Sequence, residues 1–300
     1  MPSKTLCASA LATPFASSSA EYYNPHRRKD VLVTARLENK TALIVGGGQT
    51  PGLSIGNGRA TALTFAREGA SVVVADRRLE SAQETVDLIL AEGGKAVAVE
   101  GDVTDEASII KMVQFAKQEL GRIDILQNNV GVSLAGGDAV ITEITDEAFD
   151  RVTNINIKGM VLTCKHVIPI MAEQGGGVII SIGSLASLIN YPYIAYKTSK
   201  AGVVAMTENI AIRHAKDGIR ANAILPGLME TPMAIENRVG LNGMTREDVI
   251  AERNKHVPLR NKMGSGWDVA NAALFLASEE AQFVTGVSLP VDGGQALVVG

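Results

Sequence analysis

Short apolar runs alternate with longer amphipathic segments from Thr41 to the end of the chain. The runs are rich in Val, Ile, Leu and Ala, as expected of strands buried on both faces. Gly69 and Gly93 follow two of the amphipathic segments, where a helix would end. The pattern predicts strands at Thr41–Val45, Ser71–Ala75, Lys95–Val99, Ile123–Gln127, Val178–Ile182, Arg220–Leu225 and Val287–Val291, and its first helices at Arg59–Glu68 and Leu79–Glu92. Such alternation indicates an α/β fold, a doubly wound parallel sheet in a single domain.

Two segments depart from this alternation. Met1–Ala20 is rich in Ser and Ala, contains no acidic residue and lacks the apolar stretch of a secretion signal. We expect residues 1–37 to be an N-terminal extension, either disordered, targeting, or added by an upstream start codon. Residues 38–300 would then form the domain. The strand pattern also lapses between Leu228 and Lys262, where we expect an excursion from the sheet.

The composition excludes several classes of protein. Lys and Arg number 28 and Asp and Glu 32, a net charge of −4, which gives no basic surplus for nucleic acid or an anionic membrane. Two cysteines, Cys7 and Cys164, are too few for a disulfide scaffold, and the four histidines lack metal-site spacing. We expect no metal and a cytoplasmic location, or an organelle matrix if residues 1–37 are a transit peptide.

One uncharged stretch, Gln174–Tyr196, is long enough to cross a bilayer. It contains several glycines and serines and Pro192, which a lipid-facing helix would have to accommodate. A buried strand followed by a loop explains the composition better, so we expect no membrane span.

A glycine-rich segment follows the first expected strand. Gly46, Gly56 and Gly58 lie between that strand and a helix, where backbone N–H groups and the helix N-terminus can hold a pyrophosphate. Asp76 ends the second expected strand, where a carboxylate accepts the two hydroxyls of an adenosine ribose. This arrangement favours NAD as cofactor. Arg77 and Arg78 could pair with a 2′-phosphate, which keeps NADP as the alternative.

Tyr196 and Lys200 lie one helical turn apart, so both side chains fall on one face. A free phenol has a pKa near ~10, and a neighbouring ammonium would lower it. Tyr196 would then exchange a proton with an alcohol or carbonyl oxygen. Ser184, just past a strand end, could hydrogen-bond the same oxygen.

At this point the motifs, in order, resemble those of the short-chain dehydrogenases/reductases. The matching segments are Asp102-Val103, Asn128–Gly131, Asn156–Gly159, Ser184, Tyr196–Lys200, Pro226-Gly227 with Thr231, and Val291–Gly294. The resemblance covers residues 38 to 300 and implies a Rossmann fold, an NAD(P)-dependent oxidoreductase and a homotetramer. It implies catalytic roles for Asn156, Ser184, Tyr196 and Lys200, with Asn156 holding a proton-relay water. The implied cofactor contacts are Gly46, Ser54, Gly56, Gly58, Asp76, Asp102, Val103, Asn128, Tyr196, Lys200, Met229 and Thr231.

The glycine-rich segment departs from the family pattern. From Gly46 to Gly58 it is twice the usual length and resembles the longer loop of the divergent enoyl-acyl-carrier reductases. Tyr193 also has those enzymes' spacing to Lys200. An enoyl-thioester reductase therefore remains an alternative, and a non-catalytic nucleotide-binding regulator is another. We favour carbonyl chemistry, because Ser184 and Tyr196 complete the carbonyl-reductase set.

The expected substrate pocket is mostly apolar or aromatic. Its members are Val132, Ser133, Leu134, Leu188, Asn190, Tyr191, Tyr193 and the Leu228–Lys262 segment, with Met229, Met233 and Met244 as adaptable fillers. The substrate that fits this lining is an apolar secondary alcohol or ketone. Nothing in the sequence of this region indicates a clamp for a particular anion.

Overall fold

The computed structural model describes residues 35–298, which contain a seven-stranded parallel sheet. In spatial order its strands are β3 (Lys95–Glu100), β2 (Ser71–Asp76), β1 (Thr41–Val45), β4 (Ile125–Asn128), β5 (Gly177–Ile182), β6 (Ile219–Pro226) and β9 (Ser288–Val291). Each expected strand is present within two residues of its predicted bounds. The strand order reverses between β1 and β4, the position at which doubly wound sheets bind ligands.

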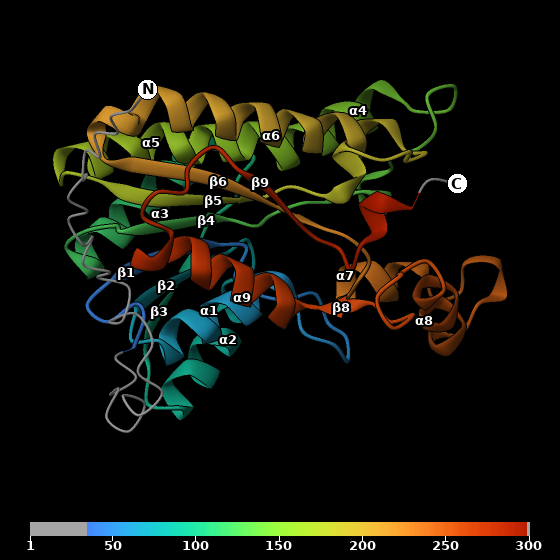
Figure 1. Ribbon diagram of the computed structural model, residues 1–300, viewed down its shortest axis with the longest axis horizontal. Helices are drawn as coiled ribbons and strands as arrows, with labels where there is room; N and C mark the ends of the chain where they lie inside the picture. Colours follow the sequence, from blue (N-terminus) through green and yellow to red (C-terminus); the bar gives the residue numbers. More distant parts are fainter. Residues whose placement is uncertain (1–34, 299–300) are drawn as a thin grey trace, which may run out of the picture. The chain divides into compact units, whose positions relative to one another are not determined.

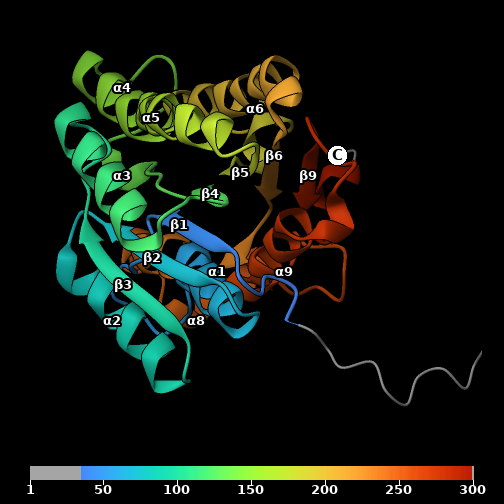
Figure 2. The same ribbon diagram turned by 90° about the vertical axis from the view of Figure 1, so that its left-hand side faces the viewer.

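Helices cover both faces of the sheet (Figures 1 and 2). One face carries α1 (Asn57–Arg67), α2 (Leu79–Ala91) and α9 (Gly266–Ala277); the other carries α3 (Glu106–Leu120), α4 (Asp146–Thr153), α5 (Gly159–Glu173) and α6 (Ile194–His214). The doubly wound single-domain architecture expected from the sequence is therefore confirmed.

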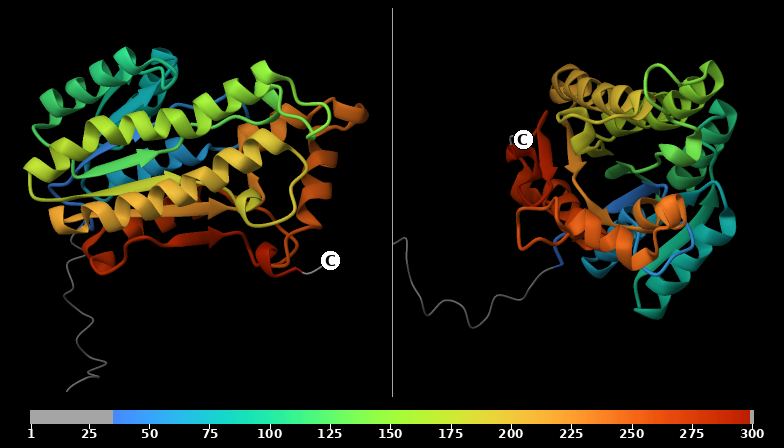
Figure 3. Two further views of the ribbon diagram at one scale, coloured as in Figure 1. Left: turned by 90° about the horizontal axis from the view of Figure 1, so that it is seen from above. Right: turned by 90° about the vertical axis from the view of Figure 1, so that its right-hand side faces the viewer.

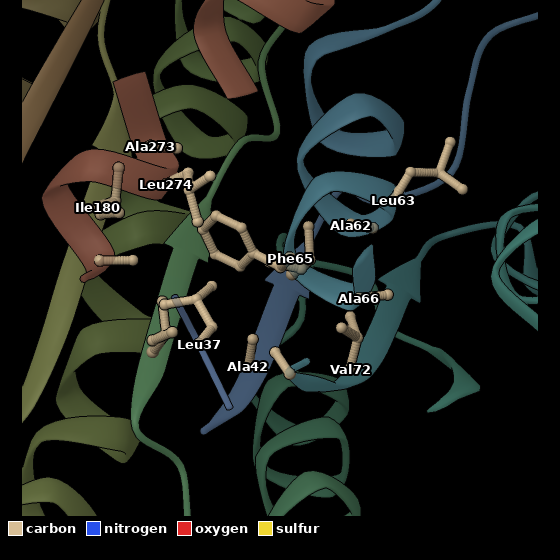
Figure 4. Packing of buried hydrophobic residues seen from close by; sticks show 14 of the residues in the cluster. Leu37, Ala42, Ala62, Leu63, Phe65, Ala66, Val72, Ile180, Ala273 and Leu274 are labelled. Atoms are coloured by element: carbon tan, nitrogen blue, oxygen red, sulfur yellow. The ribbon is translucent and has the colours of Figure 1, made fainter. Parts of the chain in front are cut away.

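Strand alternation divides the core into two clusters. Ala42 and Ile44 of β1 face α1 and α9, whereas Leu43 and Val45 face the opposite helices. Successive strand residues point to opposite faces, so both sets had to be apolar. Phe65 of α1 is fully buried near the middle of the first cluster (Figure 4).

The sequence analysis placed the start of the domain at residue 38, but residues 36 and 37 already pack against it. Leu37 is completely buried in the first cluster, and Arg36 forms an ion pair of 2.8 Å with Glu280. The expectations for residues 1–34 lie outside the described residues. The uncharged stretch at Gln174–Tyr196 contains β5 and the loop after it, and no described helix is long and apolar enough to span a membrane.

The excursion between β6 and α9 forms a small lobe, which we call the lid. The strand arrowheads point toward this orange segment in Figure 3. It contains β7 (Met229–Glu230), α7 (Pro232–Ile235), α8 (Arg246–Asn254) and three-residue 3-10 turns, and β8 (Gly264–Ser265) pairs with β7 beside it. Ile235, Val249, Val257 and Met263 form its own buried cluster. The lid therefore has its own core outside the sheet.

Candidate functional site

A cleft of about 640 Å³ lies at the carboxyl ends of the strands. Segments that follow β1, β3, β4, β5 and β6 all contribute to its lining, and the lid covers one side. The carboxyl ends of all parallel strands lie at this edge of the sheet, so residues that are distant in the chain meet there.

In the turn after β1, the main chain of Gly58 packs directly against the main chain of Gly46. A Cβ atom on Gly58 would lie 2.0 Å from the carbonyl oxygen of Gly46, and Gly46 has φ of +83°. Both positions therefore require glycine. Gly56 precedes α1 with no side-chain cap, and the first turn of α1 holds no acidic residue. The N–H groups of this turn thus lack a side-chain cap beside the cleft, where a phosphate could accept from them.

The inserted residues of the glycine-rich segment are held by Gln49. Its side-chain oxygen accepts from the N–H of Gly56 at 2.9 Å, and its main-chain oxygen accepts from Arg78 at 2.7 Å. Gly52 lies so close to α7 that a Cβ atom would be 2.9 Å from Pro232. Ser54, expected to bind cofactor, does not line the cleft, whereas Gln49 does. The insertion thus connects the phosphate turn to the lid.

Acidic residues line the cleft at the ends of β2 and β3. Asp76 accepts from the N–H of Arg78 at 3.1 Å, and a Cβ atom on Gly48 would be 2.6 Å from its carboxylate. Asp102 accepts from the N–H and hydroxyl of Thr104, and Val103 beside it is buried. All three expected contact residues line the cleft.

The paired asparagines after β4 have different surroundings from those expected. Asn128 is buried in β4, donates to the sulfur of Cys164 at 3.3 Å and does not line the cleft. Asn129 does line it, and donates to the main-chain oxygen of Gly46 at 2.8 Å. The structure therefore places Asn129, rather than Asn128, beside the glycine turn. Burial raises the pKa of the Cys164 thiol to about 12, so this cysteine is a packing residue.

Tyr196 and Lys200 both line the cleft from α6. Burial raises the pKa of Tyr196 to about 12, and the nearby Ser184 hydroxyl offsets part of that rise. Burial also lowers the pKa of Lys200 to about 8. Lys200 Nζ donates to the main-chain oxygen of Ile182 at 2.8 Å and lies 5.7 Å from the centre of the Tyr196 ring. The pKa of Tyr196 therefore lies above its ordinary value and not below it as expected, because burial has the largest effect.

Asn156 lies in a π-helical stretch, Asn154–Lys158, between α4 and α5. Its side chain is fully buried, exchanges two 2.8 Å hydrogen bonds with the backbone of Val132, and donates to Ser199 at 3.0 Å. Asn156 therefore connects the loop after β4 to α6. Both side-chain hydrogens are used, so a relay water would have to donate to an oxygen of Asn156.

Asp138 is a residue that the sequence did not single out. Its buried carboxylate accepts from the N–H of Ala195 at 3.0 Å and from that of Tyr196 at 2.9 Å. It thereby satisfies two N–H groups in the first turn of α6. A lone aspartate in a loop far along the chain carries no local signal for this contact.

The substrate side of the cleft is lined by loop residues and the lid. Val132, Ser133, Leu134, Tyr191, Met229, Thr231 and Met233 line it as expected, whereas Leu188, Asn190, Tyr193 and Met244 do not. Arg238 and Arg253 of the expected Leu228–Lys262 segment also line it, and Leu185 and Ile189 line it without having been expected. Tyr191 packs 5.5 Å from the Tyr196 ring, between Tyr196 and Tyr193. The two arginines bring positive charge into a lining that was expected to be mostly apolar or aromatic. Among residues 35–298, no cluster of metal-ligating side chains is found.

Comparisons with known proteins agree with this geometry. A family model described as Enoyl-(Acyl carrier protein) reductase matches residues 52–296. The 2-(R)-hydroxypropyl-CoM dehydrogenase of Xanthobacter autotrophicus is 36% identical over 82% of this chain and 97% of its own length. The 7alpha-hydroxysteroid dehydrogenase of Clostridium sardiniense is 37% identical over 87% of this chain and 95% of its own length.

Solved structures give the same answer. Levodione reductase superposes with a TM-score of 0.82 at 31% identity, covering 88% of this chain and all of that chain (100%). A 7 alpha-hydroxysteroid dehydrogenase complexed with NADH and 7-oxo glycochenodeoxycholic acid has a TM-score of 0.77 at 34% identity, covering 87% of this chain and 96% of that chain. Fold, motif order and relatives agree, so the chain belongs to the short-chain dehydrogenase/reductase family of oxidoreductases.

Proposed function

We propose that this protein transfers a hydride between a nicotinamide cofactor and a secondary alcohol or ketone, with Tyr196 as the acid/base. One observation carries the proposal: Tyr196, Ser184 and Lys200 share a single cleft with the glycine turn and Asp76. The relatives named as dehydrogenases of a hydroxypropyl group and a hydroxysteroid support the same reaction class.

The residues present fit a dinucleotide. Gly46 and Gly58 leave no room for side chains where a pyrophosphate would approach the open N-terminus of α1. Asp76 would accept the adenosine ribose hydroxyls, Asp102 and Val103 would border the adenine, and Met229 and Thr231 would contact the nicotinamide. When bound, the nicotinamide supplies or accepts the hydride. The Asp76 carboxylate favours NAD; an Asp76→Ala variant that gains affinity for NADPH would support its role in that choice.

The four side chains expected to be catalytic would have different roles in the transfer of the proton. Tyr196, whose pKa burial raises to about 12, keeps its proton at neutral pH and can donate it to a carbonyl oxygen during reduction. The Ser184 hydroxyl would donate to the same oxygen as negative charge develops. Lys200 would favour the phenolate that remains, and Asn156 positions α6 against the loop after β4. Alcohol oxidation requires the phenolate at the start and should therefore speed up with rising pH.

Enoyl-thioester reduction is the second candidate. The long glycine-rich segment and the description of the matching family model favour it. Tyr193, however, is the tyrosine with the spacing of those enzymes, and it does not line the cleft. Tyr196 does, which favours the carbonyl reaction.

Two matched variants separate the candidates. In Tyr196→Phe we expect ketone reduction to fall by at least about 100-fold while NADH binding, measured by fluorescence, persists. Tyr193→Phe should retain ketone reduction. Both variants and the wild type are assayed with ketones and with enoyl thioesters. Enoyl turnover that depends on Tyr193 would establish the second candidate. Cofactor binding by the wild type without turnover of either substrate class would indicate a regulator.

A homotetramer accompanies this proposal. The edge strand β9 has its outer side open within residues 35–298, and Phe283 before it is fully exposed. Leu297 and Val298 after it are also exposed. Unpaired strand edges and exposed apolar side chains favour association. Light scattering on the intact chain should give four times the mass of one chain, and Phe283→Glu should reduce it.

A further inference from the structure

The lid contains four arginines, Arg238, Arg246, Arg253 and Arg260, and only Arg246 has acidic partners among residues 35–298. Arg246 pairs with Glu230 at 3.1 Å and with Glu236 at 3.3 Å. Arg238 and Arg253 form no ion pair with a described residue. Of the three lid arginines without an acidic partner among the described residues, Arg238 and Arg253 line the cleft; Arg246 and Arg260 do not.

Both cleft arginines have N–H donors that form no hydrogen bond with a described residue. Arg238 donates to the main-chain oxygen of Ala234 at 2.8 Å. The Nε atom of Arg253 is buried and has no hydrogen-bond partner among the described residues. A guanidinium offers five N–H donors, and a buried donor without an acceptor costs about 1–3 kcal/mol. Groups left in this condition in a cleft are typical of binding sites.

The two positive charges also repel each other. Burial, together with the charge of Arg238, lowers the pKa of Arg253 to about 10. Both guanidinium groups act in turn on Tyr196, where burial and Ser184 have the larger effects. The arginines therefore lie within electrostatic reach of the reacting side chain. The carboxylate of Asp138 accepts from the first turn of α6 and does not line the cleft.

We propose that Arg238 and Arg253 bind an anionic group of the substrate, and so make this an enzyme for hydroxy or keto compounds that carry an oxyanion. The shared chemistry is that of a carboxylate, sulfonate or phosphate, each of which accepts from guanidinium in a bidentate manner. Leu134, Ile189 and Met233 line the same cleft and suit the apolar body of such a substrate. The inference rests on the proposed carbonyl chemistry and adds a charged end to a substrate expected from the sequence to be apolar.

The test compares ketones that differ only at the far end. Oxo-alkanoates of increasing chain length are assayed with NADH beside their methyl esters, and the best length is repeated as sulfonate and phosphate. We expect the wild type to prefer the anion by about tenfold or more in kcat/KM. Arg253→Gln and Arg238→Gln should each remove most of that preference, mainly through KM, and any effect that they have on Tyr196 acts on ester and anion alike and cancels in the ratio.

Arg213→Gln is the matched control, because Arg213 is an exposed residue of α6 that does not line the cleft. It makes the same change in net charge and should leave the preference intact. Binding of the unreactive alkanoate and the matching alkanol is measured by calorimetry on the same proteins, which gives a readout that does not depend on turnover.

Each outcome has a fixed meaning. Equal turnover of anions and esters by the wild type overturns the inference and leaves the proposed function standing. Loss of NADH affinity in the Gln variants by as much as the substrate effect would assign the arginines to the cofactor and also overturn it. Arginine-dependent alkanoate binding without turnover of any ketone would support anion recognition and contradict the proposed function. The sulfonate and phosphate arms identify which oxyanion fits.

Discussion

The two halves of the cleft are built in different ways. The nucleotide half, at the ends of β1 to β3, depends on main-chain contacts such as that between Gly58 and Gly46. The substrate half depends on side chains that project from loops and the lid, among them Met233 and Arg253. Main-chain contacts tolerate no added atom, whereas side chains can be exchanged. Such a division suits a family whose members share one cofactor and differ in substrate.

The largest difference between the halves should appear at Gly58. In Gly58→Ala the added Cβ would lie 2.0 Å from the Gly46 oxygen, so the turn must move. We expect NADH affinity to fall by about 100-fold or more. Gly202→Ala in α6 is the control, because Gly202 does not line the cleft and its added Cβ would lie 3.4 Å from its nearest neighbour, Ile157. Fluorescence titration of both variants measures the effect; equal losses would contradict a role for this close contact.

Between the halves, Lys200 should give a pH-dependent contribution to stability. The pKa of Lys200 is 10.5 in the unfolded chain and about 8 in the folded protein. Between these two values unfolding takes up a proton, so the free energy of unfolding rises as the pH is raised through this range. Between pH 7.5 and 9.5 we expect the wild type to gain about 2 kcal/mol relative to Lys200→Met. Urea unfolding at several pH values measures this gain. Parallel curves for the two proteins would show that Lys200 titrates normally.

In the substrate half, Asp138 should act on Tyr196 through the start of α6. Asp138→Asn keeps one acceptor, so we expect a loss of about 1–2 kcal/mol in unfolding free energy and a fall of about tenfold in kcat with little change in KM. Thr145→Ala removes a comparable cap from α4, where Thr145 accepts from the N–H of Ala148 at 3.2 Å. That variant should lose stability but keep kcat. A similar kcat loss in both would reduce Asp138 to a purely structural role.

The smallest effect is expected at Met233, which lines the cleft and is 37% exposed. Met233→Ala should change the unfolding free energy by less than about 0.5 kcal/mol. Its kcat/KM should change by less than about tenfold, with the sign set by the size of the substrate. An effect as large as that at Gly58 would remove the distinction between the two halves.

The same distinction explains what the sequence could predict. The strands and the glycine turn follow from apolar runs and from residues that are local in the chain, such as Gly46 and Gly58. Asp76 and Asp102 follow from strand ends, which a parallel sheet brings to one edge. Ser184, Tyr196 and Lys200 came from family motifs and local spacing, and all three line the cleft.

The rest depends on contacts that no local pattern encodes. Asp138 caps α6 from 57 residues away, and the arginines face the cleft only because the lid folds on its own small core. Whether Asn128 or Asn129 lines the cleft depends on which of the two side chains points toward the cleft at the end of β4. Spacing likewise could not show that Tyr193 lies outside the cleft while Tyr196 lines it.

The π-helical stretch at Asn154–Lys158 has a consequence for how this chain can change in length. Each residue of a helix turns it by about a quarter of a circle. A π-helical turn holds about one residue more than an α-helical turn, so this stretch accommodates an extra residue while α4 and α5 stay nearly in phase. Deleting one residue there would restore regular winding and leave Cys164, Val167 and Met171 directed at the core, but it would move Asn156 away from Val132. A single-residue change in length at this stretch would therefore act on Asn156 while sparing the packing of α5.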